Sequence, residues 1–219
     1  MTGLQNIVDL WKNNLHIVPE EVWRQTDTTV LILADNCLKE IPKEIGQLQH
    51  LRTLDLGHNQ LSSLPESIGQ IRGLSDFLYL HDNELTELPD SIAALRHLRY
   101  LNLSENCFVL FPQAVCHLVG LIELRMTDNQ LTELPKSIDQ LSRLRELHLR
   151  NNKFKTLPDS VGSMTELRQI DLRGNPIESL PECIADLPRI EKLDLRWINT
   201  LRPTGWLEAL ERRGCCVYR

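Results

Sequence analysis

A 23-residue period is the feature that most constrains what this chain can fold into. Eight prolines recur at intervals of 23 residues, with one interval of 24, and eight asparagines keep the same spacing. The prolines are Pro19, Pro42, Pro65, Pro89, Pro112, Pro135, Pro158 and Pro181, and the asparagines are Asn13, Asn36, Asn59, Asn83, Asn106, Asn129, Asn152 and Asn175. A period of this length is typical of repeat proteins, in which each unit packs on its neighbours.

Each unit has the form LxxLxLxxNxLxxLPxxIxxL, and LRYLNLSENCFVLFPQAVCHL is a well-preserved example. Its LxL core alternates with period 2, so Leu101 and Leu103 point one way while Tyr100 and Asn102 point the other. One such strand cannot bury its own apolar face, so the repeats must stack. We interpret the asparagines as structural, because a buried amide can both donate to and accept from the backbone of a tight turn.

The pattern resembles the leucine-rich repeat family, specifically its 23-residue LPxxI class. That class includes Ras-suppressor-like proteins, plant intracellular Ras-group-related repeat proteins and bacterial leucine-rich repeat proteins. The resemblance covers residues 13–203. It implies an α/β fold, a curved horseshoe-shaped solenoid with a parallel β-sheet on the concave face and short helices or 3-10 turns on the convex face. It also implies a binding scaffold, and not an enzyme.

We expect a single domain over residues 1–219, with the repeats at 13–203 closed by a cap at each end. Helical spacing over residues 1–14 predicts an N-terminal helical cap through Leu4, Ile7, Val8 and Trp11. Residues 204–219 predict a helix–strand cap, and this ending resembles the C-terminal cap of bacterial family members. The asparagine spacing slips after residue 175, which predicts a bulge at Trp197–Ile198.

In this frame four positions of every repeat face the concave side, and neighbours in a column lie about 5 Å apart. The stretch LSDFLYLHDN departs from the other repeats, because it has one extra residue and carries Phe77 and Tyr79 at such positions. With Tyr100 they predict an aromatic contact site, with His58 and His81 beside it. The alternative is that these rings only pair across the strands. The extra residue predicts a bulge, either functional or a tolerated insertion.

A second cluster is a row of arginines in the C-terminal half. Arg150, Arg173 and Arg196 fall in one column, and the residues nearby are Arg125, His148 and Trp197. Neighbouring carboxylates could neutralise this row locally, which would make it a solvated surface. Alternatively, the guanidinium groups could bind an acidic or phosphorylated partner. The sequence favours neither interpretation.

Several classes of function are disfavoured by the sequence. The net charge of −6 argues against a general nucleic-acid binder. No apolar run approaches 18 residues, and the first residues lack the pattern of a secretory signal. The six cysteines have no CxxC spacing, so we expect reduced thiols, no metal site and no cofactor. Phosphate-binding and hydrolase motifs are absent from the sequence, so we expect no enzymatic activity.

The sequence therefore predicts a cytoplasmic, monomeric scaffold that binds a protein partner on its concave face. One alternative is a binder of an anionic or phosphorylated ligand through the arginine row. Another is a bacterial effector that acts on a host protein, in which case the setting would be the host cytosol. Self-association through the concave face is a further possibility.

Overall fold

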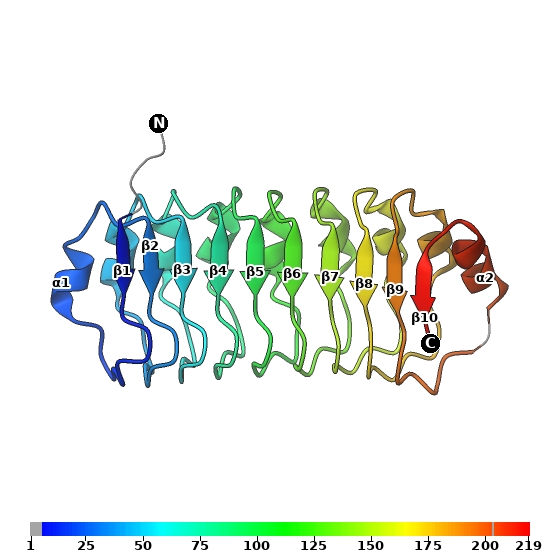
Figure 1. The fold of residues 1–219 in the computed structure, drawn as a ribbon, viewed down its shortest axis with the longest axis horizontal. Coiled ribbons are helices and arrows are strands. Elements are labelled where there is room, and N and C mark those ends of the chain that lie inside the picture. Colours follow the sequence, from blue (N-terminus) through cyan, green and yellow to red (C-terminus); the bar gives the residue numbers. More distant parts are fainter. Residues whose placement is uncertain (1–5, 203) are drawn as a thin grey trace.

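The computed structural model describes residues 6–202 and 204–219. Within these residues, ten three-residue strands form one parallel sheet whose spatial order is the order of the sequence (Figure 1). The strands are β1 (Ile7–Asp9), β2 (Val30–Ile32), β3 (Thr53–Asp55), β4 (Phe77–Tyr79), β5 (Tyr100–Asn102), β6 (Glu123–Arg125), β7 (Glu146–His148), β8 (Gln169–Asp171), β9 (Lys192–Asp194) and β10 (Cys216–Tyr218).

Short helical turns lie behind the sheet (Figure 1). In the described part of the chain, seven 3-10 helices occupy equivalent places: η1 (Lys43–Gln47), η2 (Glu66–Gln70), η3 (Asp90–Ala94), η4 (Gln113–His117), η5 (Lys136–Gln140), η6 (Asp159–Ser163) and η7 (Glu182–Asp186). The α-helices α1 (Glu20–Trp23) and α2 (Gly205–Arg212) flank this series. The expected α/β solenoid with a parallel sheet is therefore confirmed.

Each 3-10 helix follows the proline of its repeat. The proline sets an extended backbone before the helix, as at Pro42 with φ −72° and ψ 157°. Its carbonyl then accepts the first bond of the turn, such as Ile45 N–H to Pro42 O at 3.2 Å. The isoleucine that closes this bond is fully buried in the repeats where it occurs, as at Ile45, Ile92 and Ile138. The proline thus positions the side chain that packs the convex side of the core.

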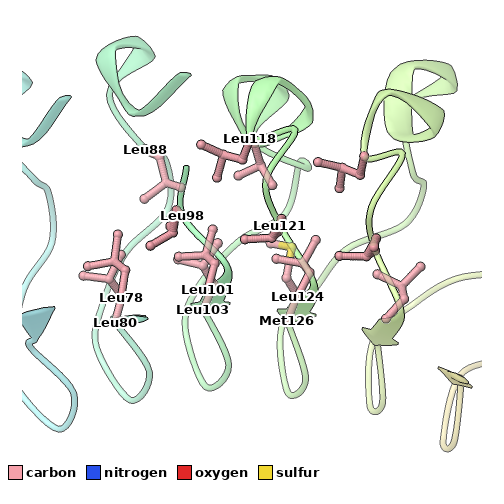
Figure 2. Close-up of a cluster of buried hydrophobic side chains, with 14 of the residues drawn as sticks. Leu78, Leu80, Leu88, Leu98, Leu101, Leu103, Leu118, Leu121, Leu124 and Met126 are labelled. Atoms are coloured by element: carbon pink, nitrogen blue, oxygen red, sulfur yellow. The ribbon is translucent and has the colours of Figure 1, made fainter. Parts of the chain in front are cut away.

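The leucines of successive repeats form one continuous core between the sheet and these turns. Figure 2 shows the stacked layers, in which Leu78, Leu101 and Leu124 repeat the same position one strand apart. All three are fully buried. Full burial of one such side chain stabilises the fold by about 1.5–3 kcal/mol relative to an exposed one, so this repeated contact is the main source of stability.

The buried asparagines hold the turns together, as expected from their chemistry. Asn129 is typical: its Oδ1 accepts from Phe108 N–H at 3.1 Å, and its Nδ2 lies 3.0 Å from Leu103 O and 3.2 Å from Thr127 O. The residues from Asn36 to Asn175 make equivalent bonds, each to its own turn and to the preceding one. Asn13 is exposed, and its Nδ2 donates to the nearby Trp11 O.

The N-terminal segment differs from the expectation of a helical cap. Ile7–Asp9 is a strand that pairs in parallel with β2, Ile7 opposite Val30 and Asp9 opposite Ile32. The exposed edge of β2 explains the difference, because an edge strand needs partners for its backbone groups and a helix would supply none. Trp11 is exposed, and Leu4 lies outside the described residues.

The C-terminal segment packs α2 and β10 against the last repeat. Leu207 and Leu210 of α2 are buried, and β10 pairs in register with β9. Gly214 ends the helix at φ 92°, and the Cys215 N–H donates to Leu210 O across the helix end. The closing helix thus buries its apolar face on the stack.

The bulge expected at Trp197–Ile198 is not found. Trp197 has φ 65°, the same left-handed turn conformation as its counterparts in earlier repeats, such as Asn151 and Gly174. The Ile198 N–H donates to Leu195 O at 3.3 Å, just as Asn175 N–H donates to Leu172 O. The turn therefore keeps its geometry, and Ile198 replaces the asparagine amide with an apolar side chain that packs against the core.

The extra residue in LSDFLYLHDN does form a bulge at the entrance to β4. In neighbouring repeats one carbonyl accepts two N–H groups from the next repeat, as Arg99 O does. Here two residues share that role, because Arg99 N–H donates to Ser75 O and Tyr100 N–H to Asp76 O, both at 3.1 Å. The strand itself stays in register, with Phe77 between Thr53 and Tyr100.

Replacing Asn129 with alanine should destabilise the fold by about 1–3 kcal/mol, because it leaves buried backbone groups of two turns without partners. Gln130→Ala, at the exposed neighbouring position, is the matched control and should change stability little. Chemical denaturation of both variants measures the difference. Equal stabilities for Asn129→Ala and Gln130→Ala would show that the asparagine bonds do not hold the turns.

Candidate functional site

The concave face carries all eleven residues that the sequence analysis selected. The first and the third residue of each strand pair with their counterparts on the next strand, as in Phe77–Tyr100–Glu123 and Tyr79–Asn102–Arg125. The concave position directly before each repeat's asparagine, or before Ile198 in the last repeat, has the left-handed turn conformation in all eight repeats from Asp35 to Trp197. Strand backbones therefore place these side chains side by side on a regular surface.

Three rings, Phe77, Tyr79 and Tyr100, form what we call the aromatic patch. The ring centroids are 5.0 Å apart for Tyr79 and Tyr100, 5.6 Å for Phe77 and Tyr100, and 5.9 Å for Phe77 and Tyr79. Phe77 is 43% exposed, while both tyrosines are half-buried. Burial raises the pKa of Tyr79 and raises the pKa of Tyr100 to about 12. Both phenols thus stay protonated at neutral pH and can donate hydrogen bonds.

Two histidines continue the patch toward the turn edge of the sheet. The His81 ring lies 6.1 Å from Tyr79 and makes an edge contact with His58 at 4.7 Å. His58 Nδ1 contacts Asp82 Oδ2 at 2.5 Å. His81 rests on the bare backbone of Gly57, where an added Cβ would come within 2.3 Å of the ring. Burial and the neighbouring His58 lower the pKa of His81, so its imidazole is neutral at physiological pH.

A shallow depression of about 380 Å³ adjoins the patch at the other edge, where the strands begin. Its lining consists of Arg52, Asp76, Phe77, Arg99, Tyr100, Ile122 and Glu123. Arg52 pairs with Asp76 of the inserted segment at 3.0 Å. The sequence analysis missed Arg52, Arg99 and Ile122 because it considered only positions within and after the strands. Their position directly before a strand could have identified them, because a side chain there borders the same face.

Arg125 and His148 lie next to the patch and belong to a separate polar group. Arg125 Nε donates to Glu123 Oε1 on its own strand. His148 is buried, with an exposed fraction of 6%, and its Nε2 lies 3.1 Å from Glu146 Oε2. Burial and the nearby Arg125 lower the pKa of His148. The sequence analysis named both residues but did not predict their contacts with Glu123 and Glu146.

Every arginine of the row has a carboxylate partner. Arg150 contacts Asp128 at 2.9 Å. Arg173 makes two bonds to Asp171, at 2.9 and 2.6 Å. Two similar bonds, at 2.9 and 2.8 Å, join Arg196 to the fully buried Asp194. Of the two interpretations left open by the sequence, local neutralisation is the one that this geometry supports.

The contacts with the arginine row offset the effect of burial on the pKa of Asp194. Burial alone would raise the pKa of Asp194, but hydrogen bonds from Arg196 and the charge of Arg173 hold that pKa below its ordinary value. Asp194 is therefore ionised at neutral pH and fixes both guanidinium groups in place. The row is an ordered part of the surface, with most of its charge already compensated.

Two exposed rings border the arginine row at the C-terminal end. The guanidinium of Arg173 lies 5.7 Å from the Trp197 ring, and that of Arg196 lies 5.3 Å from the Tyr218 ring. Trp197 is 63% exposed, and its left-handed backbone costs a bulky residue about 1–2 kcal/mol. The sequence analysis found Trp197 and missed Tyr218, because strand β10 lies beyond the last repeat and its register could not be inferred from the period.

The face as a whole offers a broad, ordered surface with an aromatic patch, adjoining polar groups and a compensated charge row. Such a surface suits the recognition of another macromolecule. In the described part of the chain, no helix is both long and apolar enough to span a membrane. All six cysteines are free thiols.

Comparison with known proteins agrees with this architecture. One family model, described as a leucine-rich repeat region, matches residues 12–96. A second, described as leucine rich repeat, matches residues 76–131 and 142–201. No curated protein matches the sequence.

Solved structures with the same fold come from bacteria and plants. A leucine-rich repeat protein of Leptospira interrogans is 25% identical with a TM-score of 0.72, over 97% of this chain and 65% of that one. The ectodomain of the Arabidopsis thaliana receptor kinase GASSHO1/SCHENGEN3, in complex with CASPARIAN STRIP INTEGRITY FACTOR 2, is 32% identical with a TM-score of 0.78, over 93% and 25%. An internalin of Listeria monocytogenes, 19% identical with a TM-score of 0.71 over 93% and 64%, shares the fold.

This chain thus spans less than two thirds of the length of each of these three proteins. The two family models together cover nearly all of its repeats, and they agree with the period, the asparagine bonds and the parallel sheet. The chain belongs to the leucine-rich repeat family.

Proposed function

We propose that this protein is a non-enzymatic scaffold that binds a protein partner on its concave face, with the aromatic patch as the anchor. The observation that carries the proposal is the cluster of Phe77, Tyr79 and Tyr100 on the solvent side of β4 and β5. Aromatic rings with a polar group are enriched at the energetic centres of interfaces. Family membership supports the proposal, because a related plant ectodomain is seen in complex with a partner.

The patch is suited to binding because its geometry is set by the fold. Its three rings come from two paired strands, and each ring contacts the other two. A partner would therefore pay little to order this surface. The protonated phenols supply hydrogen-bond donors next to an apolar ring, and the depression beside Phe77 and Tyr100 can accept a partner side chain.

We assign the arginine row a secondary role, in orienting the partner and selecting its charge. Because Arg150, Arg173 and Arg196 already contact carboxylates, a partner would meet a surface that is nearly neutral overall but has alternating charges. Such patterns favour one docking orientation more than they add affinity. An anionic ligand as the primary partner is less favoured, since it would have to compete with these carboxylates.

We further propose an intracellular setting for the protein. Its six cysteines are free, and two of them, Cys107 and Cys216, are exposed. Unpaired thiols of this kind persist in reducing compartments. The cytosol of a host cell would satisfy the same requirement if the chain is a bacterial effector.

Truncation of the patch should weaken partner binding without unfolding the protein. We expect Tyr79→Ala or Tyr100→Ala to weaken binding by about 1–3 kcal/mol, the range of interface hot spots. The measurement is affinity capture from source-cell lysate with wild type and a Phe77→Ala, Tyr79→Ala, Tyr100→Ala triple variant, followed by titration of the captured protein.

A matched control exists outside the strands of the same molecule. Val109, Leu110 and Val119 are 53%, 70% and 41% exposed and lie outside the strands, in the connection between β5 and β6. Their triple alanine variant should capture the same protein as wild type. If the patch variant captures it equally well, and circular dichroism shows both variants folded, the aromatic patch is only sheet packing.

Salt should affect the captured complex weakly. Raising ionic strength from about 0.1 M to about 1 M shortens the screening length from about 10 Å to about 3 Å, so binding centred on exposed charge would weaken steeply. Binding centred on the aromatic patch should change by less than about tenfold. A titration series over this range measures it. A far larger loss of affinity with salt, together with weakened binding by an Arg150→Ala variant at low salt, would instead favour the arginine row as the primary site.

A further inference from the structure

We propose that Glu123, Glu146 and His148 form a binding site for a divalent transition metal on the concave face, with Zn²⁺ as the ion that fits best. One carboxylate oxygen from each glutamate and one imidazole nitrogen lie within 4.8 Å of one another. Across the residues that the structure describes, this is the one place where three such donors converge. The proposal is independent of the aromatic patch.

The three donors come from adjacent strands whose register is settled by the fold. Glu123 and Glu146 are opposite each other on β6 and β7, and His148 follows two residues after Glu146 on the same face. Side chains of the two strands therefore approach from two sides without any loop movement. Sites built on regular elements of this kind hold their ligands more accurately than sites on loops.

The distances among the donors resemble those of a tetrahedral site. Ligand bonds of about 2.0–2.2 Å to Zn²⁺ place neighbouring ligand atoms roughly 3.3–3.5 Å apart. His148 Nε2 lies 3.1 Å from Glu146 Oε2 and 3.7 Å from Glu123 Oε1. Two of the three edges are thus already close to the required length. The remaining edge can close through Glu146, whose side chain is 41% exposed and free to adjust.

The donor types favour a transition metal over calcium or magnesium. One imidazole and two carboxylates match the mixed nitrogen and oxygen ligands that Zn²⁺ accepts. Calcium takes six to eight oxygens and magnesium prefers an octahedron of oxygens, and neither set is present here. Three protein ligands leave the fourth position open toward the concave solvent, where water or a group from a partner could bind.

The local charges show both what a metal would gain and what opposes it. Two carboxylates directly opposite on neighbouring strands repel each other. Arg125 compensates Glu123, whereas Glu146 contacts only the imidazole of His148 among its recorded pairs in the described residues. A cation between the glutamates would relieve the repulsion. Arg125 and the metal would share Oε1 of Glu123, which has two lone pairs, and the positive charge of Arg125 must weaken the site.

Substitutions in this group should change the affinity for Zn²⁺ in both directions. Zn²⁺ should bind metal-free wild type at one equivalent, and Glu146→Gln and His148→Gln should each weaken it by about tenfold or more, because losing even a residue that only hydrogen-bonds to a ligand costs this much. Arg125→Met should instead tighten binding, because it removes the opposing charge. Isothermal titration with ZnCl₂ alone measures all four proteins.

A control for other donors is available on the same face. His58→Gln removes an imidazole that also contacts a carboxylate, Asp82, and it should leave Zn²⁺ binding unchanged. Titration with Co²⁺ separates the proposed site from the free cysteines. Nitrogen and oxygen ligands give visible bands alone, whereas thiolate ligands add an intense near-ultraviolet charge-transfer band.

The result that supports the site is loss in both ligand variants, gain in Arg125→Met and no thiolate band. Absence of Zn²⁺ binding to wild type would overturn it, as would equal binding by wild type and Glu146→Gln. The partly exposed Glu146 keeps the test valid if the buried His148 variant melts early. Capture of a partner through the aromatic patch is a separate readout, so failure of either proposal leaves the other standing.

Discussion

The stacking of incomplete units is the constraint on which the whole structure depends. A single repeat has an apolar strand face and a turn whose backbone groups lack partners. The leucines of the next repeat cover the apolar strand face. An asparagine such as Asn129 gives the backbone groups their partners, because it bonds to two turns at once. The core and the polar ladder therefore form together, and neither can exist in an isolated unit.

This division of labour leaves the concave face free to vary. Leu101 and Leu124 must stay apolar because they are fully buried in the stack, whereas the strand residues that flank Leu101, Tyr100 and Asn102, are only partly buried. The surface consequently carries groups that the fold does not require. Near β4 and β5 these are aromatic rings, at β6 and β7 they are two glutamates and a histidine, and farther on they are paired arginines and aspartates.

The three groups differ in how far they are compensated within the protein itself. The arginines are matched by aspartates, so their charge is largely used internally. In the aromatic patch Phe77 stays substantially exposed. Among the residues that the structure describes, the two opposed carboxylates of Glu123 and Glu146 have a single guanidinium, that of Arg125, to compensate them. Groups that remain incompletely satisfied are the ones from which binding energy is available, which is why the proposals concern these two.

Repeat frame, sheet direction and the membership of the concave columns could all be predicted from the sequence, because a period of 23 residues and an alternation of two leave one consistent arrangement. The positions of Phe77, Tyr79 and Tyr100 followed from that frame. Contacts between side chains could not be predicted, since the period places Arg150 near several acidic residues and only packing selects Asp128.

The two ends show the same limit most clearly. Sequence by itself determined that the stack needs closing, but the tertiary structure decided how. At the N-terminus the unpaired edge of β2 takes Ile7–Asp9 as another strand in place of a helix, since backbone pairing outweighs helical spacing in a segment this short. At the C-terminus β10 brings Tyr218 beside Arg196. Residues outside the repeat have no period to place them, so only the folded chain sets their neighbours.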